Sequence, residues 1–536
     1  MDMENNNQTT QTPWPAPYTP KPLFDLTKRD ITFAVCGVVI SVLLSVFGIF
    51  GGFALGYCVT AICMLGLFTA YFAKGGKSSA FGILCGILAL ANAAVFLCTG
   101  NGSVRFFSVV ASFLLSLVYL DSFVNGKSVG NRGMAGLFYR AAATVEHIDI
   151  TVKALFSDRS GNRKTLGKVL VGLLCAVPVL LVVVPLLLSS DDAFKGMMDR
   201  MFENTGATIF KVVVGVMMSV FVASYGFSLQ KGRTVEEKEG KFAGIENVYI
   251  ISFLSAISVC YLLYLFSQLA YFFSAFKGFL PEGGITYAQY ARKGFFEMCV
   301  IAVINLALVF TSLLLAKKQN GKVCHGIKAL ATFIGLFTLV IIATAISKMV
   351  LYIDAYGMTV KRLTTSAFMV FLAVVFISII LRVYLLKINV VKTALITAGC
   401  IVLILGTVNV NRVCAQYNYE SYKNNKLQTV DIQALYDLGY EGIPYIVKLT
   451  DDQNQAVAKE AKHYLARAYL QDYFEDMKFK GDWLDSFTAE DLQQKEKNKE
   501  FSKFSLPRAK AYNALYAYLD DHPDFDSRCP TLLQHG

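Results

Sequence analysis

Eleven long apolar runs fill the chain from Ile31 to Val408, and a polar tail, 409–536, follows them. A helix needs about 20 apolar residues to cross a bilayer, because its backbone hydrogen bonds must be satisfied within the segment. Only 17% of the 536 residues are charged, against about 25% in soluble domains. The pattern predicts an all-α fold: a polytopic transmembrane helix bundle with a small helical C-terminal soluble domain. The predicted spans are 31–50, 53–73, 79–98, 103–123, 167–189, 207–229, 248–273, 294–316, 327–349, 364–386 and 390–408.

The apolar runs divide the chain into five parts. Residues 1–30 are polar and rich in proline, which is typical of a disordered segment. The first transmembrane helices, 31–123, and the transmembrane core, 167–408, flank a stretch, 124–166, that is too charged to cross a membrane. Apolar residues recur at helical spacing in this stretch, so it is predicted to be a basic interfacial helix pair attracted to anionic lipid. A structured loop packed on the bundle is the alternative. The tail, 409–536, is the fifth part.

The distribution of basic residues predicts an orientation. One set of loops holds roughly 24 Lys and Arg residues and the opposite set roughly 9, and such residues favour the cytoplasmic side. The N-terminus is therefore predicted to be cytoplasmic and, with an odd number of spans, the tail extracytoplasmic. The net charge of +11 lies in the membrane part, because the tail carries roughly −4. This balance indicates membrane lipids, and not nucleic acid, as the partner.

The tail has helical periodicity. Val457, Ala461 and Leu465 share one face of an amphipathic helix, and 488–491 resembles a capping box before another. A further helix is predicted to start near Pro507. A small helical bundle that docks on the membrane part is expected, and it is the place for a protein partner if there is one.

Ionisable residues inside spans are costly and are therefore candidates for function. Glu297 lies just inside the eighth predicted span, after Arg292 and Lys293. A buried Glu beside a basic residue binds a proton or a cation, or orients a substrate. A structural ion pair that anchors the start of the helix is the alternative. Tyr287 and Tyr290 belong to the same segment and complete this part of the candidate polar site.

A second candidate element, 351–362, is predicted to lie between two spans. Asp354 and Arg362 are expected to pair across it, with Gly357 permitting a sharp turn. Tyr356 suits the membrane interface, where its ring stays apolar while its hydroxyl is wet. An ordinary aromatic belt explains this element equally simply.

The third candidate is a pair of adjacent carboxylates, Asp191 and Asp192. They suit a divalent cation, but a helix cap is the simpler interpretation. The chain has no CxxC, Cys/His zinc or HExxH spacing, no P-loop and no Rossmann glycine pattern. We therefore predict no metal and no cofactor, and favour a protein that is not an enzyme. Cys414 and Cys529 form a disulfide only if the tail is extracytoplasmic.

Several of these segments resemble one bacterial protein family. Residues 287–297, YAQYARKGFFE, are similar to a signature of the family catalogued as domain of unknown function 4153/4173. Residues 187–194 and 351–359 resemble two further elements, and the run from Asn409 to Leu449 resembles its exit from the last span.

The resemblance covers residues 165–450, with its four elements in order. One departure is Asp192, where the family pattern has a small residue or proline. The resemblance implies a polytopic membrane fold and carries no established activity.

Three functions compete on the sequence alone. The favoured one is transport or lipid handling through an outward-facing polar site in the bacterial plasma membrane. The second is an envelope sensor or assembly factor that acts through its helical tail. The third is a polyprenyl-phosphate-dependent glycosyltransferase, which the acid-free first outer loop at Gly51 and Gly52 disfavours.

Overall fold

Long apolar helices dominate the computed structural model. It describes residues 27–50, 55–73, 79–125, 207–230, 244–276, 295–317, 323–385, 388–477 and 506–522, with single residues at 148, 183, 187 and 190. Ten helices in these ranges are long and apolar enough to cross a membrane. Each matches a predicted span, and the predicted all-α polytopic fold is confirmed. The one remaining predicted span, 167–189, lies outside the described residues except at 183 and 187.

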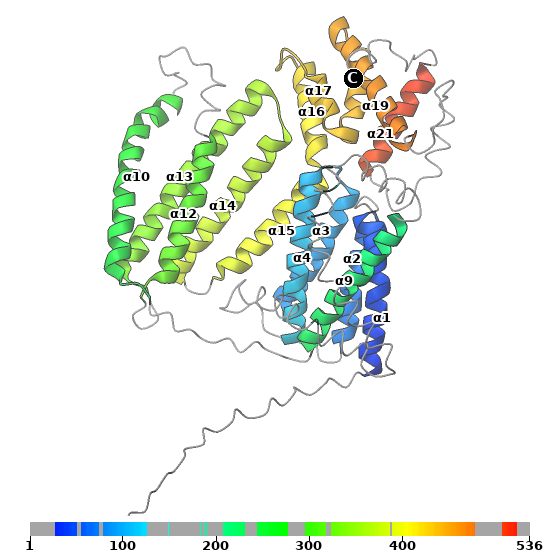
Figure 1. Ribbon diagram of the computed structural model, residues 1–536. Coiled ribbons are helices and arrows are strands. Elements are labelled where there is room, and N and C mark those ends of the chain that lie inside the picture. The colour runs from blue at the N-terminus through cyan, green and yellow to red at the C-terminus, as the bar shows by residue number, and fades with distance from the viewer. Residues whose placement is uncertain are drawn as a thin grey trace, which may run out of the picture.

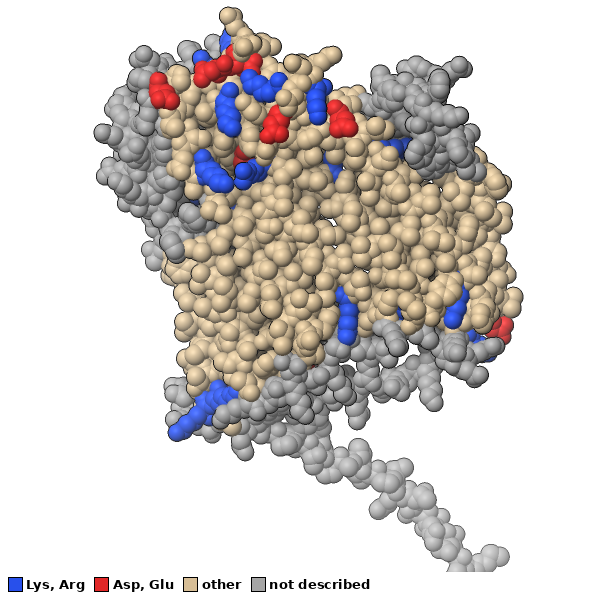
Figure 2. Space-filling model, turned by 180° about the vertical axis from the view of Figure 1, so that it is seen from behind, with Lys and Arg blue, Asp and Glu red and all other residues tan. Residues whose placement is uncertain are grey.

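The surface charge follows the same division. On the face shown in Figure 2, the charged side chains gather at the two ends of the molecule, and the broad belt between them is uncharged. An uncharged belt crossed by apolar helices is the surface that hydrocarbon requires. The chain is a multi-pass membrane protein.

Five of the long helices form an N-terminal bundle, in which α1 packs on α2 and α9, and α3 packs on α4. A Cβ added at Gly82 of α3 would lie 2.4 Å from Ser122 Oγ of α4, so this pair packs too closely for any side chain at Gly82. The elements of the N-terminal bundle are α1 (Lys28–Leu43) with η1 (Leu44–Ile49), α2 (Leu55–Phe72), α3 (Ala80–Ala94) with η2 (Val95–Leu97), α4 (Gly102–Asn125) and α9 (Ala207–Gln230).

A central bundle stands beside it (Figure 1). Inside it, the Tyr261 hydroxyl donates to Asn305 Oδ1 at 2.5 Å, and Asn305 Nδ2 donates to Thr338 Oγ1 at 2.9 Å. These polar side chains satisfy one another across three helices, as buried polar groups within a membrane must. The helices are α10 (Asn247–Phe276), α12 (Phe295–Leu315), α13 (His325–Tyr356) and α14 (Val360–Leu385).

The last span, α15 (Val390–Val408), joins the two bundles. It packs on α14 on one side and on α3 and α4 on the other. Gly399 and Gly406 allow this close approach, since a Cβ at Gly406 would lie 2.2 Å from Val95 Cγ1. α15 rises to the end of the molecule opposite the start of α1, and there it meets the tail (Figure 1).

The tail is a helical module with its own core. Ile432, Leu435, Ile446 and Leu465 are buried at its centre. The expected face of α19 is therefore the packed one. Asp431 caps α17 through the backbone N–H of Ala434. The elements are α16 (Val410–Lys423), α17 (Ile432–Tyr436), η4 (Gly439–Glu441), α18 (Ile443–Leu449), α19 (Gln455–Met477) and α21 (Leu506–Asp521). The expected capping box at 488–491 lies outside the described residues.

Candidate functional site

The polar site expected from the sequence is described only in part. Arg292, Tyr287, Tyr290, Asp191 and Asp192 lie outside the described residues. The placement of their side chains against the rest of the candidate site stays a prediction.

Glu297 lies in the first turn of α12 and is exposed. The expectation of a buried carboxylate is wrong for a geometric reason. Phe295 faces the core of the central bundle, and a residue two positions later is turned by about 200° around the helix. The Glu297 charge interacts with that of Lys348 on α13. A basic neighbour is thus present, but it comes from another helix.

Arg362 does not pair with Asp354. It donates instead to the carbonyl oxygens of Tyr356 and Gly357, and so caps the C-terminal end of α13. The Asp354 carboxylate accepts a hydrogen bond of 2.9 Å from the Tyr417 hydroxyl of α16. α13 also continues to Tyr356, so most of the element expected between two spans is helix. Gly357 makes the predicted sharp turn, with φ of +77°.

The best-defined polar site lies elsewhere, where the last span passes into the tail. Asn409 ends α15 and begins α16 in the left-handed region, with φ of 61°. Its Nδ2 donates to the Cys98 carbonyl at 2.8 Å and to Glu441 Oε1 at 3.1 Å. Its Oδ1 accepts from the Arg412 backbone N–H at 3.3 Å. One side chain therefore connects the last span, the α3–α4 loop and the tail module.

Glu441 is the buried acid of this joint, with 5% of its surface exposed. Its Oε1 also accepts a hydrogen bond of 2.7 Å from the Gly100 backbone N–H. The Arg105 guanidinium on α4 attracts the carboxylate from nearby. A Cβ at Gly100 would lie 3.1 Å from both carboxylate oxygens, so glycine leaves room for the acid.

A second amide pair reinforces the joint. Asn101 Nδ2 donates to Asn411 Oδ1 at 2.8 Å, and Asn411 Nδ2 donates to the Leu438 carbonyl at 2.9 Å. Asn411 is buried. Buried amides that are satisfied on both sides hold two parts in one register, so the tail module is fixed on the N-terminal bundle.

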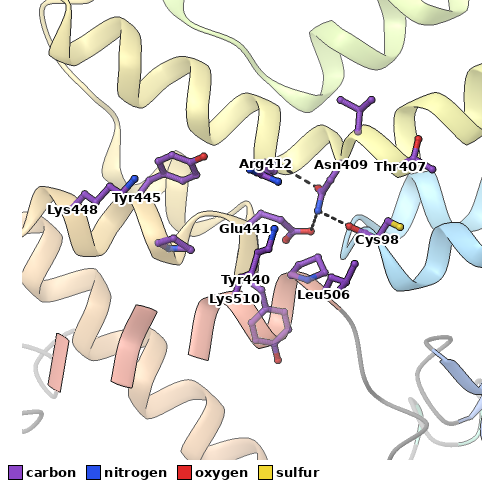
Figure 3. Close-up of a pocket in the computed structure, with 13 residues that line it drawn as sticks. Cys98, Thr407, Asn409, Arg412, Tyr440, Glu441, Tyr445, Lys448, Leu506 and Lys510 are labelled. Atoms are coloured by element: carbon purple, nitrogen blue, oxygen red, sulfur yellow. Dashed lines mark hydrogen bonds between the residues drawn. The ribbon is translucent and has the colours of Figure 1, made fainter. Parts of the chain in front are cut away.

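A cavity of about 260 Å³ opens beside this joint (Figure 3). We name it the junction cavity. Elements from four parts of the chain meet there: the α3–α4 loop, the α15–α16 joint, η4 with α18, and the start of α21. It is lined by Cys98, Thr407, Val408, Asn409, Arg412, Tyr440, Glu441, Pro444, Tyr445, Lys448, Leu506, Pro507 and Lys510.

The charged side chains of the junction cavity are mostly cations. Arg412, Lys448 and Lys510 come from α16, α18 and α21, and each is exposed. The Lys448 Nζ lies 5.3 Å from the centroid of the Tyr445 ring and 5.6 Å from that of Tyr419. These aromatic faces favour a position for the ammonium group without neutralising it.

The remaining border of the junction cavity is apolar and open. Val408 at the end of the last span is 55% exposed, and Leu506 at the start of α21 is 48% exposed. Cations on one side and exposed apolar side chains on the other match the boundary between lipid headgroups and hydrocarbon.

Neither a metal site nor a reactive thiol is found at this place. Within the described ranges, no three His, Cys, Asp or Glu side chains are grouped to hold a metal ion. Burial raises the pKa of the Cys98 thiol, so this thiol is protonated at neutral pH and is a poor nucleophile. The three cations of the cavity suit an anionic ligand.

Sequence reasoning did not single out this cavity. Its members range from Cys98 to Lys510, and no short motif contains more than a few of them. The only signal was the family-like run from Asn409 to Leu449, which contains Arg412, Glu441 and Lys448.

Residues 34–449 match the family described as Domain of unknown function (DUF4153). The chain belongs to this family. The suspected resemblance is confirmed, and the matched region includes both bundles and the tail as far as Leu449. The joint and two of the three cations of the junction cavity are thus part of the DUF4153 region, whereas α21, which carries Lys510, lies beyond it. Neither the curated proteins nor the solved structures contain a match to the chain.

Proposed function

We propose that this protein handles lipid in the cell membrane, and that it binds the phosphate group of an anionic lipid in the junction cavity. The observation that carries the proposal is the meeting of three cations from three helices at the exposed end of the last span. Lys and Arg side chains near a membrane surface attract anionic headgroups by about 1 kcal/mol each. The arginine adds directed hydrogen bonds to phosphate oxygens.

The surface available to an acyl chain of the lipid supports the same proposal. Only 11% of the most apolar stretch of α15 is buried, the lowest share among the ten described spans. Most of its side chains are half-buried, and the exposed ones, Ile404, Thr407 and Val408, gather at the end beside the junction cavity. An acyl chain lying against this end of α15 would bring its headgroup to Arg412 without leaving the membrane.

The proposal includes the orientation, with the tail extracytoplasmic and the N-terminus cytoplasmic. The excess of Lys and Arg in the loops on the other side supports it. The ligand would then come from the outer leaflet. A reporter fused at Gly536 that works only in the cytoplasm would contradict this orientation.

The test measures binding of short-chain phosphatidylglycerol and phosphatidylcholine to the purified full-length protein in detergent. We expect tighter binding of phosphatidylglycerol, weakened about fivefold by each of Arg412→Gln, Lys448→Gln and Lys510→Gln. Lys459→Gln on the exposed surface of α19 is the matched control and should change nothing. Equal binding of both lipids, or equal effects of all four substitutions, would reject the proposal.

Two further variants distinguish the competing functions. Glu297→Gln tests the polar site expected from the sequence and should leave lipid binding at the junction cavity intact. If Glu297→Gln abolishes lipid binding while the three cation variants do not, the functional site is the one beside α12. If a cellular phenotype is lost on removing 413–536 but kept in all the point variants, the tail acts through a protein partner.

A further inference from the structure

Glu441 is the one acid among the described residues that line the junction cavity. Both hydrogen bonds that it accepts in the described part of the chain, from Gly100 and Asn409, end on Oε1. Oε2 has no hydrogen-bond donor there. A carboxylate that is 5% exposed and lines a cavity therefore keeps one oxygen able to accept from a bound molecule.

This oxygen restricts what the junction cavity can hold. An ionised carboxylate accepts hydrogen bonds and donates none, and it repels phosphate oxygens. When Arg412, Lys448 and Lys510 bind the phosphate, another part of the ligand must therefore face Glu441. That part has to carry a hydrogen-bond donor, because an apolar group would leave the buried oxygen without a partner.

The donor is a hydroxyl and not an ammonium. Among the described lining residues, three cations and one carboxylate leave an excess of two positive charges, which opposes the entry of a cationic group. The volume of about 260 Å³ is below the usual range for drug-sized ligands, about 300–1,000 Å³, and so fits one small headgroup.

We infer that the junction cavity selects a phosphodiester headgroup with free hydroxyls, of the glycerol-phosphate type, and that Glu441 Oε2 reads the hydroxyl. The inference rests on the proposed lipid function and names the class of lipid. Glu441 is thereby a specificity-determining residue, while the three cations supply the attraction common to all phosphates.

The experiment compares three lipids with identical short acyl chains on the full-length protein in detergent: phosphatidylglycerol, phosphatidic acid and phosphatidylethanolamine. We expect phosphatidylglycerol to bind about tenfold more tightly than either of the others. Glu441→Gln should reduce the preference over phosphatidic acid to about twofold or invert it, because the Gln amide can donate to phosphate. Glu420→Gln, at an exposed acid of α16, is the matched control.

A second variant covers the case in which Glu441→Gln does not fold. Gly100→Ala keeps every charge but places a Cβ 3.1 Å from both carboxylate oxygens, and so shifts the acid. It should lower phosphatidylglycerol binding several-fold and leave phosphatidic acid binding nearly unchanged.

The outcomes separate the two proposals. If none of the phospholipids binds, the proposed function itself fails. If anionic lipids bind but phosphatidylglycerol and phosphatidic acid are equal in the wild type, or the preference survives Glu441→Gln in folded protein, the selection by Glu441 is overturned. Tightest binding of phosphatidylethanolamine overturns it as well.

Discussion

Asn409 Nδ2 donates to Glu441 Oε1 at 3.1 Å, across the boundary between the last membrane span and the tail. Asn409 is 6% exposed and Glu441 5%. The bond joins the end of α15, where the chain leaves the last span, to η4 of the tail module. It connects two walls of the junction cavity, so the binding proposed there would depend on the stability of this joint.

Glu441→Ala should loosen this joint. The substitution removes the acceptor of the Gly100 backbone N–H and one of the two acceptors of the buried Asn409 Nδ2, which costs about 1–3 kcal/mol. We expect a lower free energy of unfolding in detergent and faster release of the tail by limited proteolysis. Glu420→Ala, at an exposed acid that accepts only from Gln416, should change stability by less than about 0.5 kcal/mol. Equal effects of the two substitutions would show that the joint contributes nothing.

Two substitutions at Asn409 distinguish the contribution of its left-handed backbone from that of its side-chain hydrogen bonds. Asn409→Gly keeps the left-handed conformation but loses the bonds to Cys98 and Glu441. Asn409→Ala loses the same bonds and also pays about 1 kcal/mol for the left-handed backbone. Thermal unfolding should therefore rank wild type above Gly and Gly above Ala. An alanine variant as stable as the glycine variant would contradict the role of the backbone.

The spans were predictable and the junction cavity was not, for physical reasons. A run of about 20 apolar residues directly reflects the thickness of the bilayer, and the spacing of Ala461 and Leu465 directly reflects a buried helix face. The cavity depends on where the tail docks, and no local sequence pattern predicts that Lys510 lines the same cavity as Arg412. The sequence instead favoured ionisable residues near span ends as the candidate site. In the structure, Glu297 faces outward and Asp354 accepts a hydrogen bond from a tyrosine of the tail.

Gly357 should tolerate no side chain. Its φ of +77° strains any other residue, and a Cβ there would lie 2.6 Å from Asn418 Oδ1. Asn418 holds the turn by bonding both the N–H and the carbonyl of Met358, at 2.7 and 2.9 Å. We expect Gly357→Ala to lower the free energy of unfolding by about 2 kcal/mol or more.

Gly439→Ala is the matched control for Gly357→Ala. Its φ is +70°, but nothing lies within 4 Å of the added Cβ. It should cost only the backbone strain, about 1 kcal/mol. The difference between the two variants, measured by thermal unfolding, reports the clash with Asn418, and a difference of zero would contradict it.

The tail carries a titratable pair, Lys423 and Asp452, whose Nζ and Oδ2 lie 2.5 Å apart. Burial alone would raise the pKa of Asp452, but hydrogen bonds led by that from Lys423 outweigh it and hold the pKa below 3.8. The resulting stabilisation is complete above this ordinary value and is lost as the pH falls through the lower pKa of the folded state. The hydrogen bond to Asp452 raises the pKa of Lys423 above 10.5. The stabilisation that comes from protonated Lys423 is therefore present below that pH and is lost only above it.

Because Lys423 is 40% exposed, the pair should contribute about 0.2–1 kcal/mol. A double-mutant cycle of Lys423→Ala and Asp452→Ala at pH 7 measures this coupling by thermal unfolding. The coupling should decrease as the pH falls below 3.8 toward the lower pKa of Asp452 in the folded state. A coupling near zero at pH 7, or one that does not decrease in acid, would mean that the two charges contribute nothing to stability.

Cys98 provides a probe of the joint beside the junction cavity, because Asn409 binds its carbonyl oxygen. Burial raises the pKa of its thiol above 9.0, so maleimide should label it more slowly than a free cysteine at pH 7, and labelling should accelerate toward pH 10. The thiol points away from Glu441 (Figure 3) and interacts with the Cys58 thiol, whereas the Cys98 carbonyl is held by Asn409, which also binds Glu441. A headgroup bound at Glu441 would steady this joint and so limit the openings that expose the thiol. We expect saturating short-chain phosphatidylglycerol to slow labelling several-fold, as quantified by mass spectrometry of the Cys98 peptide, with Cys98→Ser defining the background. Labelling that stays constant while the lipid demonstrably binds would show that the lipid does not steady the joint at Asn409.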